Sequence, residues 1–422
     1  MRPRAVFLGI DLGTSGVRIG ALDERARPYA LIGRRWPRGC HAVPAVWRHM
    51  SLALLTAFRQ GPGRGLPIAA IAVAGTSGSL LLCRPIDGLP ISPALMYNDA
   101  RAGPHATRAH AAGLPPGPAA GPLGGVAKML WLKERYAATR PLTALPQAAW
   151  LSGVLTGRFR VADHHNVLKL GFEHHWHAAL AALGLTPLLP DVVAPGTPLG
   201  PLRAVFTRRL RLQEAPLIVA GTTDSMAALA ALGDLPMGTG VTSLGSTLVL
   251  KVASPRPVAD PAYGIYSHRL AHTWFAGGAS ESGGAVLAHY FDNAELKGLS
   301  QGLPLAEPLN LHYYPLLRPG ERFPVNDPAL RPRITPRPPD DRRFLQALFE
   351  GLAEIEALGY KRLAECGAPP VRRVVTTGGG AANAAWTAIR ARTLGVPVIC
   401  APARPAAFGA ARLALEAFMR HA

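Results

Sequence analysis

AVFLGIDLGTSGVRIGAL, residues 5–22, consists of an apolar run, a polar turn rich in glycine and a second apolar run. Both runs contain residues that favour strands, so the stretch predicts a β-hairpin with its turn at residues 11–16. Asp11 ends the first run, and Thr14 and Ser15 lie in the turn. Glycine lets backbone N–H groups approach an anion, hydroxyls add donors, and a carboxylate can hold Mg²⁺ through water. This motif alone is equally well interpreted as a phosphate site or as an ordinary hairpin.

A second hairpin of the same kind is predicted at residues 239–252. Its turn, Gly245-Ser246-Thr247, repeats the glycine and hydroxyl chemistry of the first one. Mixed strands and helices follow each hairpin, so we interpret the chain as an approximate internal duplication. This pattern predicts an α/β protein with a central cleft between two similar domains. The predicted domains are 1–220 and 221–422.

A third glycine-rich segment joins a predicted strand to a helix predicted over residues 384–394. Gly379 and Gly380 lack side chains that would keep a flat or anionic group away from the backbone at the helix N-terminus. Asn383 can both donate and accept hydrogen bonds there. The segment has neither the Gly-Lys-Ser/Thr of a Walker A motif nor a G-x-G-x-x-G pattern, which disfavours P-loop enzymes and Rossmann dehydrogenases.

Four polar residues stand beside apolar runs where they could bind a substrate. Asp224 follows a predicted strand and begins an alanine-rich segment, where a carboxylate can accept the proton of a hydroxyl that attacks phosphorus. A helix N-cap is an equally good interpretation of this aspartate. Ser77, Asn98 and Asp99 could hydrogen-bond a polyol, or they could form ordinary polar turns.

The net charge of +19 first suggests a nucleic acid or an anionic membrane surface as a partner. However, the basic residues are mostly arginine and are spread along the whole chain, without a basic stripe or an aromatic RNA-binding motif. We therefore predict no nucleic-acid partner. No stretch of about 20 apolar residues occurs, which predicts no membrane span.

Cysteine and histidine positions also limit the possible functions. The four cysteines are far apart, which predicts neither a disulfide framework nor a zinc site and fits a cytoplasmic protein. Histidines cluster between His164 and His177, but only His174 and His177 have an i, i+3 spacing. Surface histidines are the favoured interpretation of this cluster over a metal site.

Taken in order, these segments resemble the FGGY family of carbohydrate kinases over nearly the whole chain. The resemblance is carried by seven segments: 9–18, 93–101, 125–133, 221–224, 242–247, 278–284 and 378–386. It implies two ribonuclease H-like domains of the group that includes actin, sugar kinases and heat-shock ATPases. It also implies a monomer or homodimer whose partners are a small sugar and ATP.

The resemblance further implies ATP- and Mg²⁺-dependent phosphorylation of a sugar hydroxyl. Asp224 would act as the general base, and Asp11 would lie near the attacking oxygen and hold Mg²⁺ through water. The implied nucleotide-binding residues are Thr14, Ser15, Gly245, Ser246, Thr247, Gly379, Gly380 and Asn383. The implied sugar-binding residues are Asp11, Ser77, Asn98, Asp99 and Asp224.

The sugar is indicated by the turn Gly75–Ser79, which reads GTSGS. It lacks the Arg-Glu pair of glycerol kinases and the Gln-Met-His-Gly of typical bacterial xylulokinases. The turn and the YGIYSHR stretch at 263–269 are similar to the D-ribulose kinase branch of cyanobacteria and plants, so D-ribulose is the predicted substrate. D-xylulose, another small polyol and a sugar-sensing regulatory role stay open as alternatives. Glu281 and residues 404–406 depart from the family pattern, which can alter nucleotide affinity or domain closure.

Overall fold

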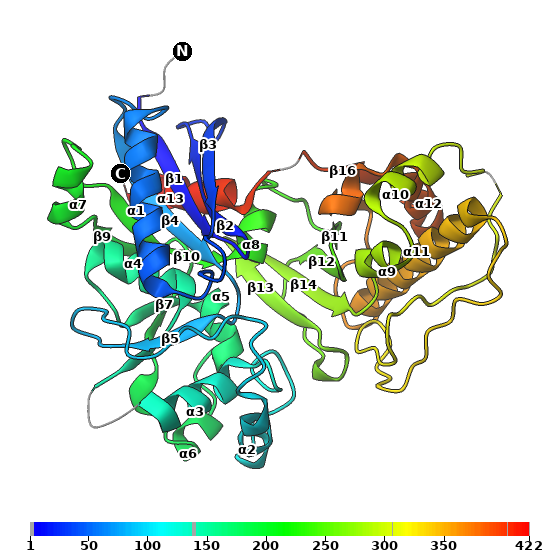
Figure 1. Ribbon diagram of the computed structural model, residues 1–422, viewed down its shortest axis with the longest axis horizontal. Coiled ribbons are helices and arrows are strands. Elements are labelled where there is room, and N and C mark those ends of the chain that lie inside the picture. The colour runs from blue at the N-terminus through cyan, green and yellow to red at the C-terminus, as the bar shows by residue number, and fades with distance from the viewer. Residues whose placement is uncertain (1–3, 137–140, 306, 403, 422) are drawn as a thin grey trace. The chain divides into compact units, whose positions relative to one another are not determined.

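The computed structural model describes residues 4–136, 141–305, 307–402 and 404–421 (Figure 1). The chain divides into two compact units, and each contains a six-stranded sheet with helices packed against it. The first unit comprises Met1–Gly233 and Arg404–Ala422, and the second comprises Asp234–Ala403. The predicted α/β class is therefore confirmed.

The sheet of the first unit has the strand order β3-β2-β1-β4-β10-β9. Its strands are β1 (Val6–Leu12), β2 (Gly16–Leu22), β3 (Pro28–Arg35), β4 (Ile68–Gly75), β9 (Pro198–Pro201) and β10 (Leu217–Thr223). β1, β4 and β10 are neighbours and run parallel, whereas β2 returns antiparallel beside β1 as the predicted hairpin. The carboxyl ends of the three parallel strands therefore meet at one edge of the sheet, where open α/β sheets bind their ligands.

Helices cover both faces of the first sheet. On one face, α13 (Ala406–His421) packs against β1, β2 and β4 and against α8 (Asp224–Ala230). This contact is so close that a Cβ atom on Gly9 would lie 1.9 Å from the carbonyl oxygen of Ala407. The other face is covered by α1 (Pro44–Gln60), seen in front of the strands in Figure 1, and by α4 (Gln147–Thr156), which bury Trp47 and Trp150.

The remaining elements of the first unit are short and surround the carboxyl edge or the outer rim of this sheet. The strands are β5 (Leu80–Cys83), β6 (Thr143–Pro146), β7 (Val161–Asp163) and β8 (Asp191–Val193). The helices are η1 (Gly103–His105), α2 (Ala106–Ala111), α3 (Gly125–Tyr136), α5 (His164–Val167), η2 (Leu168–Leu170), α6 (Ala179–Ala182), η3 (Thr186–Leu188) and α7 (Ala204–Arg209).

The sheet of the second unit has the order β13-β14-β12-β11-β15-β16. Its strands are β11 (Thr239–Leu244), β12 (Leu248–Ser254), β13 (Tyr266–Leu270), β14 (Thr273–Ser280), β15 (Arg373–Thr377) and β16 (Val398–Cys400). β11, β15 and β16 are parallel, and β12 returns antiparallel beside β11. The two sheets thus share a pattern in which an antiparallel hairpin is followed by parallel strands, as the predicted duplication requires.

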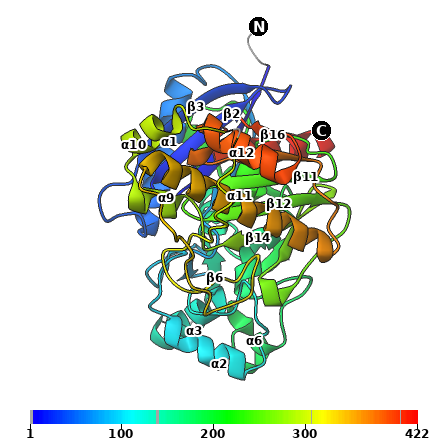
Figure 2. The same cartoon turned by 90° about the vertical axis from the view of Figure 1, so that its right-hand side faces the viewer.

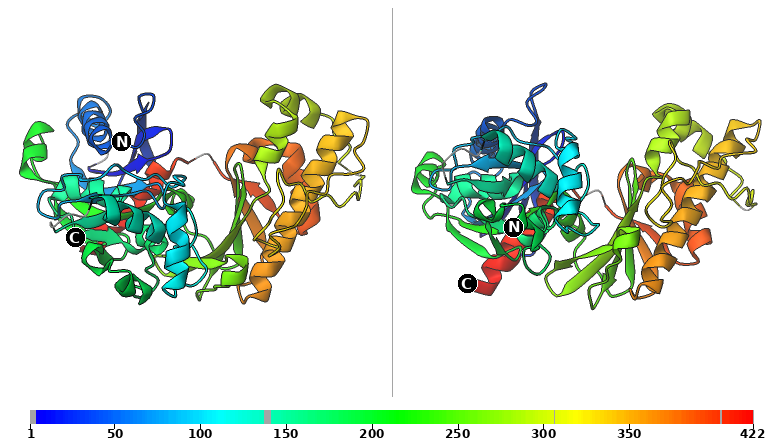
Figure 3. Two further views of the ribbon diagram at one scale, coloured as in Figure 1. Left: turned by 60° about the horizontal axis from the view of Figure 1, so that its bottom comes forward. Right: turned by 90° about the horizontal axis from the view of Figure 1, so that it is seen from below.

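The helices of the second unit pack mainly on one face of its sheet. They are η4 (Pro261–Tyr263), α9 (Gly284–Tyr290), α10 (Asn293–Ser300), α11 (Asp341–Glu365), η5 (Gly379–Ala382) and α12 (Ala384–Leu394). Figures 2 and 3 show the orange helices α11 and α12 on the same side of the green strands β12 and β14. Apolar residues of α11, including Phe344 and Leu352, join Leu250 and Trp386 in the core of this unit.

The compact units differ from the predicted domain boundary between residues 220 and 221. β10 continues to Thr223 in the first sheet and leads directly into α8, so the first unit extends to Gly233. The C-terminal helix α13 belongs to the first unit because its small residues pack on β1 and on α8. A Cβ atom on Gly409, for example, would lie 1.7 Å from the carbonyl oxygen of Ala227.

Two further observations concern the whole described chain. No helix within the described ranges is long and apolar enough to cross a lipid bilayer. The four cysteines, Cys40, Cys83, Cys366 and Cys400, are free thiols.

Candidate active site

Three of the predicted site residues lie at the carboxyl edge of the first sheet. Asp11 is near the end of β1, Ser77 follows β4, and Asp224 follows β10. The strand register brings these ends together, because Leu12 and Thr223 both pair with Gly75 from opposite sides. The sheet topology thus gathers three residues that span 213 positions of the sequence, from 11 to 224.

Asp11 is a buried carboxylate in an unusual electrostatic setting. Its side chain is about 2% exposed, and its Oδ2 lies 3.5 Å from a guanidinium nitrogen of Arg18. Burial, followed by the negative charge of Asp224, raises the pKa of Asp11 to about 6, although Arg18 opposes this shift. A buried carboxylate whose pKa is raised by burial and by a neighbouring carboxylate is typical of a functional site.

Asp224 is the first residue of α8, and Thr223 is the N-cap of this helix. The Oγ1 atom of Thr223 accepts a hydrogen bond from the backbone amide of Met226, at 3.3 Å. The N-cap interpretation of Asp224 is therefore wrong, and its carboxylate is not used as the cap. Burial raises the pKa of Asp224, while the amides of Ser225 and Ser77 and the ammonium of Lys169 lower it.

The residues around Asp11 fit a magnesium ion that is held mainly through water. Asp11 Oδ1 is buried and has no hydrogen-bond partner among the described residues, so one carboxylate oxygen is available for such a ligand. Mg²⁺ in phosphate-transfer sites typically uses one or two carboxylates and keeps several waters.

The described chain contains no group of three or more histidine, cysteine or acidic side chains suited to a metal. In the histidine cluster, His165 is buried with its Nδ1 atom 2.7 Å from Thr222 Oγ1.

The turn after β4 is fixed by side chains on both sides of Ser77. Thr76 donates its backbone amide and its hydroxyl to Oε1 of Gln147, at 3.0 and 2.8 Å. The hydroxyls of Thr76 and Ser79 are 2.6 Å apart, and Ser79 Oγ accepts the amide of Tyr97 at 2.9 Å. Ser77 itself is half-buried, and its hydroxyl is not part of this network. The turn therefore holds Ser77 with its hydroxyl available to a substrate.

The predicted sugar residues Asn98 and Asp99 lie in the loop that pairs with this turn. Asn98 is exposed, whereas the carboxylate of Asp99 accepts several hydrogen bonds from the guanidinium of Arg101, at 2.6 to 3.0 Å. These bonds are the main reason that the pKa of Asp99 is lowered. Asp99 is thus engaged in a local ion pair, and Asn98 is the freer of the two to meet a substrate.

The two hairpin turns present their hydroxyls to solvent. Thr14 and Ser15 are exposed in the first turn, which closes through the Gly13 amide and the Gly16 carbonyl at 3.0 Å. Gly245, Ser246 and Thr247 are likewise exposed in the second turn. The two turns belong to different units, and each offers the backbone and hydroxyl donors that a phosphate group requires.

A pocket of about 750 Å³ lies within the second unit beside its hairpin turn. It has aromatic, glycine and polar walls, and its volume is within the range of small-molecule sites. Six of its lining residues illustrate this mixture: Gly245, Ser246, Gly379, Gly380, Asn383 and Trp386. Trp386 stacks on Phe349 with the rings 5.2 Å apart and nearly parallel, which gives the pocket a flat apolar floor.

The second hairpin turn is supported by a buried polar network in the same unit. The fully buried guanidinium of Arg390 donates to both carboxylate oxygens of Glu356, at 2.6 and 2.7 Å, and to Thr376 Oγ1 at 2.8 Å. Glu356 also accepts the hydroxyl of Thr242 in β11. The bidentate pair joins α11 to α12, and the two threonines tie it to β11 and β15, the strands beside the second hairpin turn.

Asn383 lines this pocket, but both ends of its amide already have protein partners. Its Oδ1 atom accepts the amide of Trp386 at 3.0 Å and so caps α12, and its Nδ2 atom donates to Ser300 Oγ at 2.8 Å. Asn383 therefore shapes the pocket by holding α10 to α12.

The resemblance to the carbohydrate kinases implies that ADP binds in this pocket. On that expectation, Asn383→Ala should weaken ADP binding about tenfold, because it removes the cap of α12 and its connection to α10, together worth about 1 kcal/mol or more. Isothermal titration calorimetry with ADP measures this effect. Thr393→Val is the control, since its hydroxyl bonds only the Ile389 carbonyl farther along α12. An ADP affinity within twofold of the unsubstituted protein would contradict the structural role given to Asn383.

Two polar residues beside the turn Gly75–Ser79 are not marked by any sequence motif. Gln147 anchors Thr76, and Lys169 donates to the carbonyl of Ser77 at 3.4 Å while its charge acts on Asp224. Neither residue lies in a glycine-rich motif, and both reach the site through contacts with residues more than 50 positions away. Only the fold places them there.

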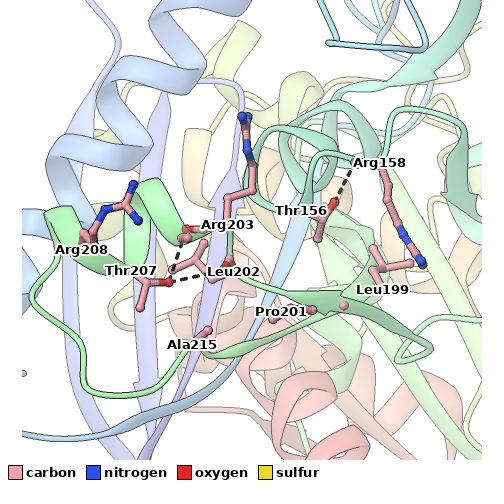
Figure 4. Close-up of a pocket in the computed structure, with 11 residues that line it drawn as sticks. Thr156, Arg158, Leu199, Pro201, Leu202, Arg203, Thr207, Arg208 and Ala215 are labelled. Carbon is pink, nitrogen blue, oxygen red and sulfur yellow. Dashed lines mark hydrogen bonds between the residues drawn. The ribbon is translucent and has the colours of Figure 1, made fainter.

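Another pocket of the first unit, of about 450 Å³, contains three arginines, Arg158, Arg203 and Arg208. Figure 4 shows their guanidinium groups pointing in different directions. The guanidinium of Arg203 lies 5.8 Å from the centroid of the Phe206 ring. The charges are therefore not focused on one point in the pocket.

Glu281, which departs from the family pattern, is exposed and lies 3.5 Å from Arg318, so its charge is partly compensated.

Comparison with known proteins finds a family model that matches the C-terminal part of the chain and curated relatives that align with 61% of it. Residues 238–418 match the model of the FGGY family of carbohydrate kinases, C-terminal domain. A xylulose kinase from Streptomyces rubiginosus is 29% identical over 285 residues, and one from Streptomyces coelicolor is 30% identical over 278 residues. Each alignment covers 61% of this chain and 56% of the relative, so the match spans little more than half of these relatives.

Solved structures match almost the whole chain. A crystal structure described as a xyloylose kinase from Brucella ovis has a TM-score of 0.86 and 26% identity, and covers 98% of this chain and 91% of that one. A gluconate kinase from Lactobacillus acidophilus has a TM-score of 0.83 at 19% identity, and covers 99% of this chain and 90% of that one, a likeness of fold alone. The expected sugar-kinase fold is thereby confirmed.

Proposed function

We propose that this chain, which carries a C-terminal domain of the FGGY family of carbohydrate kinases, transfers the γ-phosphate of ATP to a hydroxyl of a small sugar. The observation that carries the proposal is the pair Asp11 and Asp224 at the carboxyl edge of the first sheet. The pocket of the second unit, with its glycine turns and aromatic floor, supports a nucleotide as the second substrate.

In the proposed mechanism, Asp224 accepts the proton of the attacking hydroxyl. The neighbouring Ser77 amide and the ammonium of Lys169 favour its ionised form, which is the form that a base requires. Asp11 would hold Mg²⁺ through water, and bound Mg²⁺ supplies charge neutralisation on the phosphates. Each hairpin turn would offer hydroxyl and amide donors to phosphate oxygens, since phosphoryl transfer depends mainly on positioning and on charge stabilisation.

Among sugars, we propose D-ribulose, phosphorylated to D-ribulose 5-phosphate. The support is the GTSGS turn at Gly75–Ser79, which offers a small hydroxyl at Ser77, together with the exposed Asn98 in the adjacent loop. The xylulose kinases among the relatives favour D-xylulose as the second candidate.

We expect ADP release to be stimulated by D-ribulose at least tenfold more efficiently, in kcat/KM, than by any other sugar tested. A coupled ADP assay with ribulose, xylulose, ribitol, erythritol and glycerol measures this preference. A tenfold preference for another sugar would replace D-ribulose as the substrate. No sugar-stimulated ADP release at all would contradict the kinase function and favour a sugar-sensing role.

A further inference from the structure

Lys128 in α3 is a fully buried lysine beside the two loops that carry Ser77 and Asn98. Its Nζ atom donates to the carbonyl oxygens of Gly78 at 2.9 Å, Met96 at 2.7 Å and Tyr97 at 3.2 Å. An ammonium group has three N–H donors and no acceptor, so these three bonds account for its whole hydrogen-bonding capacity.

Burying this charge is costly, and in the described part of the chain no carboxylate forms an ion pair with it. The nearest acidic side chain that acts on it, Asp99, is bound by Arg101. Burial and the ammonium of Lys169 lower the pKa of Lys128 to about 8. An apolar side chain at this position would avoid the desolvation cost. A contribution to the stability of the fold therefore does not explain the lysine, whereas its three bonds to the loop carbonyls do.

The three carbonyls belong to the two loops that carry the predicted sugar residues. Gly78 directly follows Ser77, and Tyr97 directly precedes Asn98. Gly78 has a φ of +87°, and its carbonyl oxygen is oriented by the bond from the Lys128 ammonium. Lys128 therefore bonds both loops at once, and it adds to the bond between Ser79 Oγ and the Tyr97 amide in holding Ser77 and Asn98 at a fixed spacing.

We propose that Lys128 is a positioning residue that holds these two loops in the geometry which binds the sugar. It does not touch the reacting atoms, so its loss acts on the sugar and not on the nucleotide, whose pocket lies in the second unit. This inference rests on the proposed kinase function where it is tested by the sugar KM. The test by amide hydrogen exchange does not depend on that function.

The test compares Lys128→Met with Lys133→Met in the full-length protein. Lys133 is a matched control because it lies in the same helix and also donates to two backbone carbonyls, those of Leu183 and Gly184. Neither carbonyl belongs to the loops that carry Ser77 and Asn98. We expect Lys128→Met to raise the sugar KM about tenfold or more and to leave ADP affinity within twofold, since small displacements of binding groups have large kinetic effects. Lys133→Met should change neither quantity by more than twofold.

Amide hydrogen exchange over residues 76–80 and 95–99 provides the readout that needs no activity. We expect faster exchange in both segments for Lys128→Met and no change for Lys133→Met. Unchanged exchange together with an unchanged sugar KM would overturn the proposal. If Lys128→Met does not fold, Lys128→Gln, which retains two N–H donors, takes its place, and failure of both to fold would overturn it in favour of a purely structural role. Absence of sugar-stimulated ADP release in the unsubstituted protein would refute the kinase function, while the exchange data would still decide the role of Lys128.

Discussion

Asp224→Asn is expected to lower kcat by about 10³-fold while leaving ADP affinity within about twofold, because a positioned general base contributes on the order of 10² to 10⁴ in rate. The substitution removes the proton acceptor and keeps the size of the side chain, so α8 and its Thr223 cap should remain intact. Steady-state ADP release at saturating sugar gives kcat, and calorimetry gives the ADP affinity.

The matched control is Asp191→Asn, an exposed aspartate in β8 of the same unit. It removes the same charge from the same unit, so it controls for the change in net charge. We expect this variant to retain full activity. Retained activity in Asp224→Asn would show that another group accepts the proton and that Asp224 is misassigned.

The parts of this site that could be predicted from the sequence are those in which the chemistry is local. Asp11 with its turn and Gly379 with Gly380 stand out because strand, turn and functional residue are adjacent in the chain. From residue types alone, an N-cap and a catalytic role fit Asp224 equally well, because the geometry that makes Thr223 the cap appears only in the fold.

The parts that could not be predicted depend on contacts between distant segments. Lys128 reaches carbonyls 31 to 50 residues away, and Gln147 binds Thr76 from 71 residues away. Neither residue type is unusual in a helix, so no local signal marks them. The return of α13 to the first unit is of the same kind, because it depends on the glycine contacts between β1 and a helix 400 residues later.

The parallel arrangement of β1, β4 and β10 explains why the predicted site residues Asp11, Ser77 and Asp224 converge although they come from three separate motifs. Each motif is a strand followed by a polar turn, and a parallel sheet places all such turns at one edge. Recognising strand–turn units is therefore enough to predict a site, whereas the order of the strands decides which turns become neighbours.

Asp11→Asn is expected to lower kcat by about 10²-fold or more and at the same time to stabilise the protein at neutral pH. The carboxylate has a pKa of about 6 in the folded protein against 3.8 as its ordinary value, because it is buried and close to Asp224. One pKa unit corresponds to about 1.4 kcal/mol, so the ionised side chain costs the fold roughly 3 kcal/mol at pH 7.5. Asparagine carries no charge and removes this cost, and functional sites commonly sacrifice stability in this way.

The gain in unfolding free energy from Asp11→Asn depends on pH. Between pH 4 and pH 6 the folded protein binds a proton at Asp11 that the unfolded chain has lost, so stability from this group falls as the pH rises through that window. The advantage of Asp11→Asn in unfolding free energy should therefore be small near pH 4, increase up to about pH 6 and stay constant above it. Urea unfolding of both proteins at pH 4.5 and 7.5 measures the difference. An advantage independent of pH, or a variant less stable than the parent at pH 7.5, would show that Arg18 outweighs burial and that Asp11 is not under electrostatic strain.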